Sequence, residues 1–140
     1  MNDRDTFVLD TNVLVDALLF KSSFGRRAFD IVRATGTLVL STPTYSELVE
    51  VLYRPRLRRY IEEEERRAYL GKLGAMAIFV EPSQAIRACR DPKDDKFLEL
   101  AVASKAVAII TRDIDLIVLD PFQGVRIFEA QAFVEQAKIT

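Results

Sequence analysis

The chain has 140 residues, 49% of them hydrophobic, and this length and composition predict a single domain over residues 1–140 with one buried core. Its 20 Lys and Arg residues nearly balance its 21 Asp and Glu residues, which argues against both a disordered acidic chain and a strongly basic DNA-coating protein. Histidine is absent, so the sequence excludes His-based general-base catalysis, nucleophile pairs that need His, and zinc sites with His ligands.

Cysteine content and hydropathy indicate a compartment. Cys89 is the only cysteine, which excludes an intramolecular disulfide and fits a reducing environment. No stretch approaches the roughly 20 apolar residues of a membrane span, and the start MNDRDTFVLD lacks the apolar core of a signal peptide. We therefore expect a cytoplasmic protein with no membrane partner.

Short apolar runs typical of buried strands alternate with longer segments of helical period, which predicts an α/β fold with a mainly parallel sheet. The expected strands are residues 7–9, 38–40, 77–80, 107–110 and 125–128. The expected helices are 24–32, 45–53, 91–105 and 130–137, with an exposed, highly charged pair of helices between 56 and 75. Thr42 is a predicted N-cap with Pro43 at the first helical position, and Pro55 is predicted to end that helix.

Four carboxylates stand where ligands bind in parallel sheets, at the carboxyl ends of strands and the starts of the helices that follow. Asp10 directly follows the first strand, and Asp113 comes shortly after the strand at 107–110. Glu47 lies in the first turns of the helix after the second strand, and Asp94 in the first turn of the helix at 91–105. The topology therefore predicts that all four side chains reach one rim of the sheet.

Each acid also has a structural explanation when it is taken alone. Asp10 is as well placed to N-cap the next helix as to act in catalysis. Glu47 fits an ordinary solvent-facing helix position, and its neighbour Glu50 has an equal claim to a functional role on composition. Single positions therefore do not identify a site.

The acids are nevertheless more numerous than caps and turns require. Asp91, Asp94 and Asp95 crowd one helix start, although a capping box needs only the first two. Asp113 and Asp115 crowd one strand exit that needs a single turn former. Crowded carboxylates repel one another, and a divalent cation resolves that conflict. Ligand sets made only of oxygen favour Mg²⁺ or Mn²⁺ over zinc.

Four motifs follow one another in the order found in a known family. They are Val8-Leu9-Asp10-Thr11-Asn12-Val13-Leu14-Val15, Ser46-Glu47-Leu48, Asp91-Pro92-Lys93-Asp94-Asp95-Lys96-Phe97-Leu98 and Ile110-Thr111-Arg112-Asp113-Ile114-Asp115-Leu116. Together they resemble the PIN-domain ribonucleases, specifically the toxin components of type II toxin-antitoxin systems. The resemblance implies a three-layer α/β/α fold with a central, mainly parallel sheet and an acidic pocket that binds Mg²⁺ or Mn²⁺.

The resemblance also implies which side chains form that pocket. The family's metal-binding and catalytic acids correspond to Asp10, Glu47, Asp94 and Asp113. Supporting or alternative positions fall on Asn12, Asp95, Thr111 and Asp115, with Asp95 an alternative to Asp94 and Asp115 to Asp113. Arg112 departs from the family, which often has glycine at that place, and it could contact a phosphate or fold away.

The activity implied is metal-dependent endonucleolytic cleavage of phosphodiester bonds in single-stranded RNA, by the toxin of a toxin-antitoxin pair. Bound metal would lower the pKa of water and neutralise charge on the phosphate. Arginines at 54–59 and 26–27 either bind RNA phosphates or form a solvated face. A cognate antitoxin would cover the pocket or a groove beside it, with 13–20 and the helices of 56–75 as candidate surfaces, and homodimers are common in the family.

Other classes of protein also place acids at the ends of strands. A haloacid-dehalogenase-type phosphatase normally has a second aspartate two residues after Asp10, where this chain has Asn12. A receiver-like phosphoacceptor needs a lysine after a late strand, where this chain has Thr111 and Arg112. A PIN-fold protein that interacts without cleaving is the main alternative, and the four intact acids argue against it.

Overall fold

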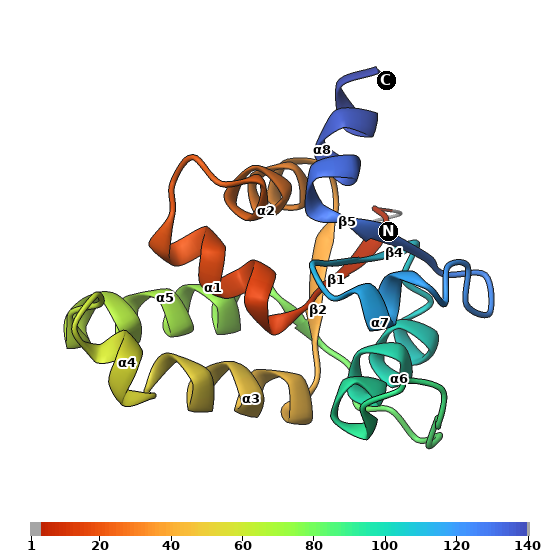
Figure 1. Ribbon diagram of the computed structural model, residues 1–140, viewed down its shortest axis with the longest axis horizontal. Coiled ribbons are helices and arrows are strands. Elements are labelled where there is room, and N and C mark those ends of the chain that lie inside the picture. Colours follow the sequence, from red (N-terminus) through yellow and green to blue (C-terminus); the bar gives the residue numbers. More distant parts are fainter. Residues whose placement is uncertain (1–3, 140) are drawn as a thin grey trace.

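The computed structural model describes residues 4–139 and contains a five-stranded sheet in which all neighbouring strands are parallel (Figure 1). The strands are β1 (Thr6–Leu9), β2 (Thr37–Leu40), β3 (Ile78–Phe79), β4 (Ala108–Thr111) and β5 (Arg126–Glu129). Their order across the sheet is β3-β2-β1-β4-β5. This order confirms the predicted parallel sheet and brings the carboxyl ends of all five strands to one edge.

Helices connect the strands, as parallel pairing requires. They are α1 (Thr11–Leu19), α2 (Phe24–Thr35), α3 (Thr42–Leu52), α4 (Pro55–Arg58), α5 (Glu63–Met76), the 3₁₀ helix η1 (Pro92–Asp94), α6 (Asp95–Ser104), α7 (Ile114–Ile117) and α8 (Ala130–Ile139). None of those described has the length and apolar character needed to cross a lipid bilayer.

Two hydrophobic cores, one on each face of the sheet, create the predicted three-layer α/β/α architecture (Figure 1). Phe7 and Leu9 of β1 face the larger core, which α1, α2, α3, α5 and α8 complete, while Val8 between them faces the core formed with α6 and α7. Because β1, β2 and β4 are buried on both faces, they are largely continuous apolar runs in the sequence instead of alternating ones.

The structure corrects three local predictions. Ser41, not Thr42, is the N-cap of α3, because its hydroxyl accepts a hydrogen bond from the Thr44 N–H and the Thr44 hydroxyl accepts one from the Ser41 N–H. Pro55 begins α4 instead of ending α3, which stops at Leu52. Helix α7 was not predicted, since four residues are too few to show a helical period.

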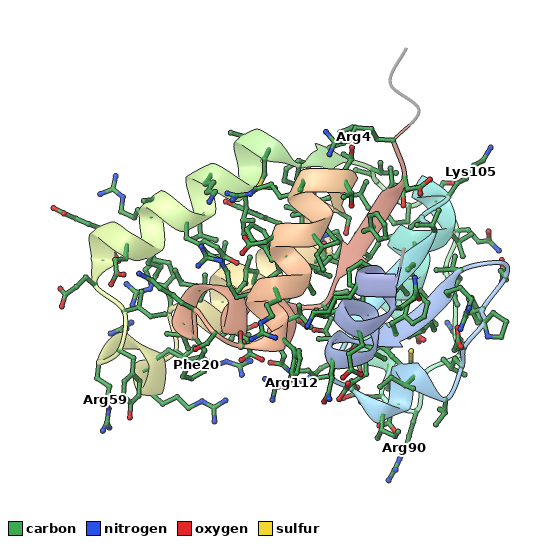
Figure 2. All side chains as sticks on the ribbon, turned by 90° about the horizontal axis from the view of Figure 1, so that it is seen from above. Arg4, Phe20, Arg59, Arg90, Lys105 and Arg112 are labelled. Carbon is green, nitrogen blue, oxygen red and sulfur yellow. The ribbon has the colours of Figure 1, made fainter. Side chains whose placement is uncertain are left out.

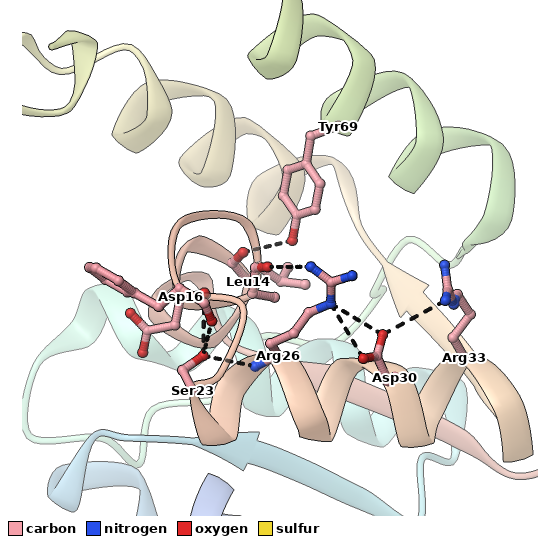
Figure 3. A network of polar contacts seen from close by, with 9 residues as sticks. Leu14, Asp16, Ser23, Arg26, Asp30, Arg33 and Tyr69 are labelled. Carbon is pink, nitrogen blue, oxygen red and sulfur yellow. Dashed lines mark hydrogen bonds and ion pairs between the residues drawn. The ribbon is translucent and has the colours of Figure 1, made fainter. Parts of the chain in front are cut away.

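Polar contacts with the backbone fix α1 against α2 and α5 (Figure 3). The Tyr69 hydroxyl of α5 donates a hydrogen bond of 2.6 Å to the Leu14 carbonyl. Arg26 of α2 pairs with Asp30 at 3.3 Å and donates a bond of 3.4 Å to the Ala17 carbonyl. These contacts hold in place the helix whose N-cap is Asp10.

Helix α3 is fixed by a buried arginine of α5. Arg66 is 3% exposed, and it donates hydrogen bonds to the carbonyls of Leu52, at 2.8 Å, and Ile61, at 3.1 Å. Its guanidinium therefore satisfies carbonyls at and beyond the end of α3 that the helix leaves without partners. The helix that carries Glu47 is held at this end by Arg66 and at its start by the capping box.

Candidate functional site

Asp10 is the most buried acid at the carboxyl edge of the sheet, with 4% of its surface exposed. Its Oδ1 caps α1 by accepting a hydrogen bond of 2.9 Å from the Val13 N–H, and its Oδ2 accepts one from the Thr111 hydroxyl. Burial raises the pKa of Asp10 to about 6 against the effect of these bonds, and the nearby charge of Asp113 adds to the rise. The side chain is thus both a helix cap and a carboxylate that burial disfavours in its charged form.

Asp94 lies near Asp113, whose carboxyl group acts on the pKa of Asp94. The pKa of Asp94 is raised to about 7, and burial is the largest cause. Hydrogen bonding with Asp113 and the charges of Asp113, Asp91 and Glu47 add to the rise. Asp113 caps α7, and its N–H donates a bond of 2.9 Å to the Thr111 hydroxyl. Thr111 therefore links Asp113 to Asp10.

Glu47 is oriented by donors from two other helices. Its Oε1 accepts a bond of 2.6 Å from the Lys96 ammonium of α6, and its Oε2 accepts one from the Thr11 hydroxyl of α1. The neighbouring Glu50 is exposed and pairs with Arg54 at 2.7 Å, so it lies outside this cluster of contacts. The charge of Asp113 raises the pKa values of both Asp10 and Asp94, and that of Glu47 raises the pKa of Asp94, so the four predicted acids lie within electrostatic reach of their neighbours.

The alternative aspartates occupy different positions. Asp95 is buried and accepts bonds from the N–H groups of Ala88, at 3.0 Å, and Cys89, at 2.7 Å. Burial acts to raise the pKa of Asp95, but these two backbone hydrogen bonds outweigh it and lower the pKa. Asp115 donates its N–H to Asp113 Oδ1 at 2.9 Å. Asp95 therefore orders the segment before α6.

Within residues 4–139, no three acidic or thiol side chains are arranged so as to enclose a metal ion. Asp10 and Glu47 are each held by protein donors on both of their oxygens. The chemistry of the side chains nevertheless suits a hard divalent cation, because the predicted ligands are all carboxylates and the pKa values of Asp10 and Asp94 are raised. Ligation of an ion would require rotation of these side chains.

A groove of about 680 Å³ lies beside the acids, between α1, the end of α3 and α4. Its lining is mostly apolar and also includes arginines and other polar side chains. The lining residues are Asn12, Val15, Asp16, Leu19, Phe20, Val51, Arg56, Leu57, Tyr60 and Arg112. Arg112, whose role the sequence left open, pairs with Asp16 of α1 and remains half exposed. Figure 2 shows Arg112 and Phe20 along one edge of the molecule, opposite Arg4 and Lys105 near the starts of β1 and β4.

Lys96 is the residue of this site that the sequence reasoning missed. Its position two residues after Asp94 was visible within a quoted motif, but its partner Glu47 is 49 residues away in the chain. Only the packing of α6 beside α3 brings the two together. A lysine close to a predicted acid on a helix start is the signal that could have suggested it.

Comparison with known proteins places these features in a family. The family model described as the PIN domain matches residues 6–115. Over 116 residues, 80% of this chain and 73% of the relative, the sequence is 33% identical to the uncharacterized protein MJ1680 of Methanocaldococcus jannaschii.

Solved structures with 18% identity or less share the fold. PAE2754 from Pyrobaculum aerophilum superposes with a TM-score of 0.63 and 13% identity over 97% of this chain and 91% of that one. DNA-bound VapBC from Salmonella typhimurium superposes with a TM-score of 0.60 and 18% identity over 89% of this chain and 98% of that one. VapBC2 from Rickettsia felis, bound to a DNA fragment from their promoter, superposes with a TM-score of 0.58 and 14% identity over 87% of this chain and 96% of that one.

Proposed function

The chain belongs to the PIN-domain family, whose members are generally nucleases, and we propose on this premise that it is a divalent-metal-dependent endoribonuclease. The observation that carries the proposal is the group of acids at the carboxyl edge of the sheet, in which burial and like charge raise the pKa values of Asp10 and Asp94. Carboxylates strained in this way are typical of functional sites.

The residues that would hold Mg²⁺ or Mn²⁺ are Asp10, Glu47, Asp94 and Asp113. When bound, such an ion supplies a more acidic water and neutralises charge on the phosphate. Thr111 orients Asp10 by donating to its Oδ2 and orients Asp113 by accepting its N–H. Burial and the nearby Asp113 carboxyl group favour the protonated form of Asp94, and metal binding would release a proton from such a ligand.

The substrate is single-stranded RNA and the partner is a cognate antitoxin, so that the chain acts as the toxin of the pair. Two of the structures that share its fold are VapBC complexes, and the groove beside the acids offers an apolar surface for a partner segment. Its walls come from α1 and α4, which include the surfaces expected from the sequence. A homodimer stays a prediction.

Cleavage of a labelled single-stranded RNA by the purified protein tests the activity. Mg²⁺ or Mn²⁺ should support cleavage and EDTA should stop it, while single-stranded DNA and duplex RNA of the same sequence serve as competing substrates. Wild-type rates in Asp10→Asn would contradict the proposed metal site. Binding of RNA without cleavage in either metal would favour the alternative, a PIN-fold protein that interacts without cleaving. In that case the protein donors that already hold Asp10 and Glu47 would have a structural role.

A further inference from the structure

Lys96 is the one basic side chain that pairs with any of the four acids within residues 4–139. It is the second residue of α6, and its ammonium lies 2.6 Å from Glu47 Oε1, with the two side chains 20% and 23% exposed. The Lys96 side chain is therefore only partly covered where it meets the acidic site.

Holding Glu47 does not use all of this ammonium. A lysine has three N–H donors, and the structure pairs one of them, with Glu47, in the part of the chain that it describes. Glu47 is also oriented independently, because the Thr11 hydroxyl donates to its second oxygen. The ammonium also lies 5.7 Å from the centre of the Phe97 ring, but within residues 4–139 two of its donors have no hydrogen-bond acceptor, beside the place where a phosphate would meet the carboxylates.

The balance of charge gives these donors a use. Four carboxylates and Lys96 together carry about −3 when all are ionised, and a bound divalent cation reduces this to about −1, which still repels a phosphodiester. A metal ion bound by Glu47 also weakens the attraction between Glu47 and Lys96. The ammonium can then donate to an oxygen of the incoming phosphate.

We propose that Lys96 binds the phosphate of the RNA substrate at the acidic site, an inference that rests on the proposed nuclease function. It contacts the substrate directly, whereas a purely structural lysine would only neutralise Glu47. The two roles differ in what removal of Lys96 does to the binding of RNA. If Lys96 is purely structural, its loss should raise the affinity for metal and leave the affinity for RNA unchanged. If Lys96 binds the phosphate, its loss should raise the affinity for metal and lower the affinity for RNA.

Lys96→Gln and Lys96→Arg test the proposal, with Lys93→Gln as the matched control. Lys93 lies three residues earlier, is exposed, and forms no ion pair within residues 4–139. Calorimetry measures Mn²⁺ binding to metal-free protein, and fluorescence anisotropy measures binding of a random-sequence single-stranded oligoribonucleotide in Ca²⁺. Lys96→Gln should bind Mn²⁺ several-fold more tightly and RNA about tenfold more weakly, since a charge-assisted hydrogen bond is lost.

Lys96→Arg should keep most of the RNA affinity, and Lys93→Gln should change both affinities by less than about twofold. Wild-type RNA affinity in Lys96→Gln would overturn the proposal, as would an equal loss in Lys93→Gln. Circular dichroism checks folding, and Lys96→Met, which keeps the aliphatic stem, replaces a Gln variant that fails to fold. Lys96-dependent RNA binding without cleavage would refute the nuclease function and leave this role standing.

Discussion

At the scale of single residues, Asp10 combines two requirements that oppose each other. Its carboxylate caps α1 and is ordered by Thr111, yet burial raises its pKa to about 6. At neutral pH the folded protein therefore bears the cost of ionising a buried acid. This is the expected signature of a group kept for chemistry at the expense of stability.

Asp10→Asn should consequently abolish nuclease activity and stabilise the metal-free protein. The amide still accepts the Val13 N–H and is as good an N-cap as Asp, but it carries no buried charge. The free energy of unfolding at neutral pH should rise by roughly 1–2 kcal/mol. Urea denaturation in EDTA measures the gain, with Asp5→Asn, at an exposed position just before β1, as a control. A loss of stability would show that the charge of Asp10 is instead needed for folding.

Asp94 and Asp95 are adjacent in sequence and should respond in opposite ways. Asp95→Asn weakens two bonds from part-buried backbone N–H groups and should cost roughly 1–2 kcal/mol of stability, with Mn²⁺ affinity nearly unchanged. Asp94→Asn relieves repulsion by Asp113 and should retain stability, but it should weaken Mn²⁺ binding by about tenfold or more. Calorimetric titration and thermal melts of both variants give the comparison. Equal metal affinities for the two variants would contradict the assignment of Asp94.

At the scale of elements, sequence patterns located the central strands well because their short, continuous apolar runs, bounded by polar residues, are typical of strands buried on both faces of a sheet. The rule that parallel strands share a carboxyl edge then predicted that Asp10 and Asp113 lie at the same rim. Helix starts were less readable. Ser41, Thr42 and Thr44 all carry hydroxyls suited to capping, and only the backbone geometry selects Ser41.

Contacts between elements were beyond the sequence altogether. The choice between Asp94 and Asp95 depends on which carboxylate faces the N–H groups of Ala88 and Cys89, and no local pattern encodes that packing. The same holds for Lys96 and Glu47, on helices separated by 49 residues. Periodicity predicts which elements form, while their side-to-side packing decides which neighbours at a helix start reach the site.

The arginines around α4 divide into two groups that should affect RNA binding differently. Arg56 lines the groove, whereas Arg54 pairs with Glu50 at 2.7 Å and Arg58 donates to the Tyr53 carbonyl at 3.1 Å. Arg56→Ala should therefore lower the slope of log Kd for single-stranded RNA against log salt by about 0.7, the value for one phosphate contact. Arg54→Ala is the matched control and should change the slope little. Equal slopes for the two variants would indicate that the arginines around α4 form a solvated face and do not bind RNA phosphates.

At the scale of the whole molecule, raised and lowered pKa values together set how stability depends on pH. The pKa of Asp10 rises from 3.8 to about 6 and that of Asp94 to about 7, so the folded metal-free chain binds more protons than the unfolded chain above pH 3.8. Stability must then fall as pH rises through this range. Asp95 and Asp120 have lowered pKa values, and their contributions are lost as pH falls below that of the unfolded chain.

In EDTA, the free energy of unfolding should therefore be greatest near about pH 4 and should decline toward pH 8, with Asp10 alone accounting for at most about 3 kcal/mol of the whole decline. Urea denaturation across this range measures the curve, and Asp10→Asn should flatten it. Saturating Mn²⁺ should stabilise the chain most at the alkaline end, because metal binds the deprotonated acids. Stability that rises from pH 5 to 8 without metal would mean that these acids are solvated in the folded chain, and the physical basis for a metal site at this edge would then be lost.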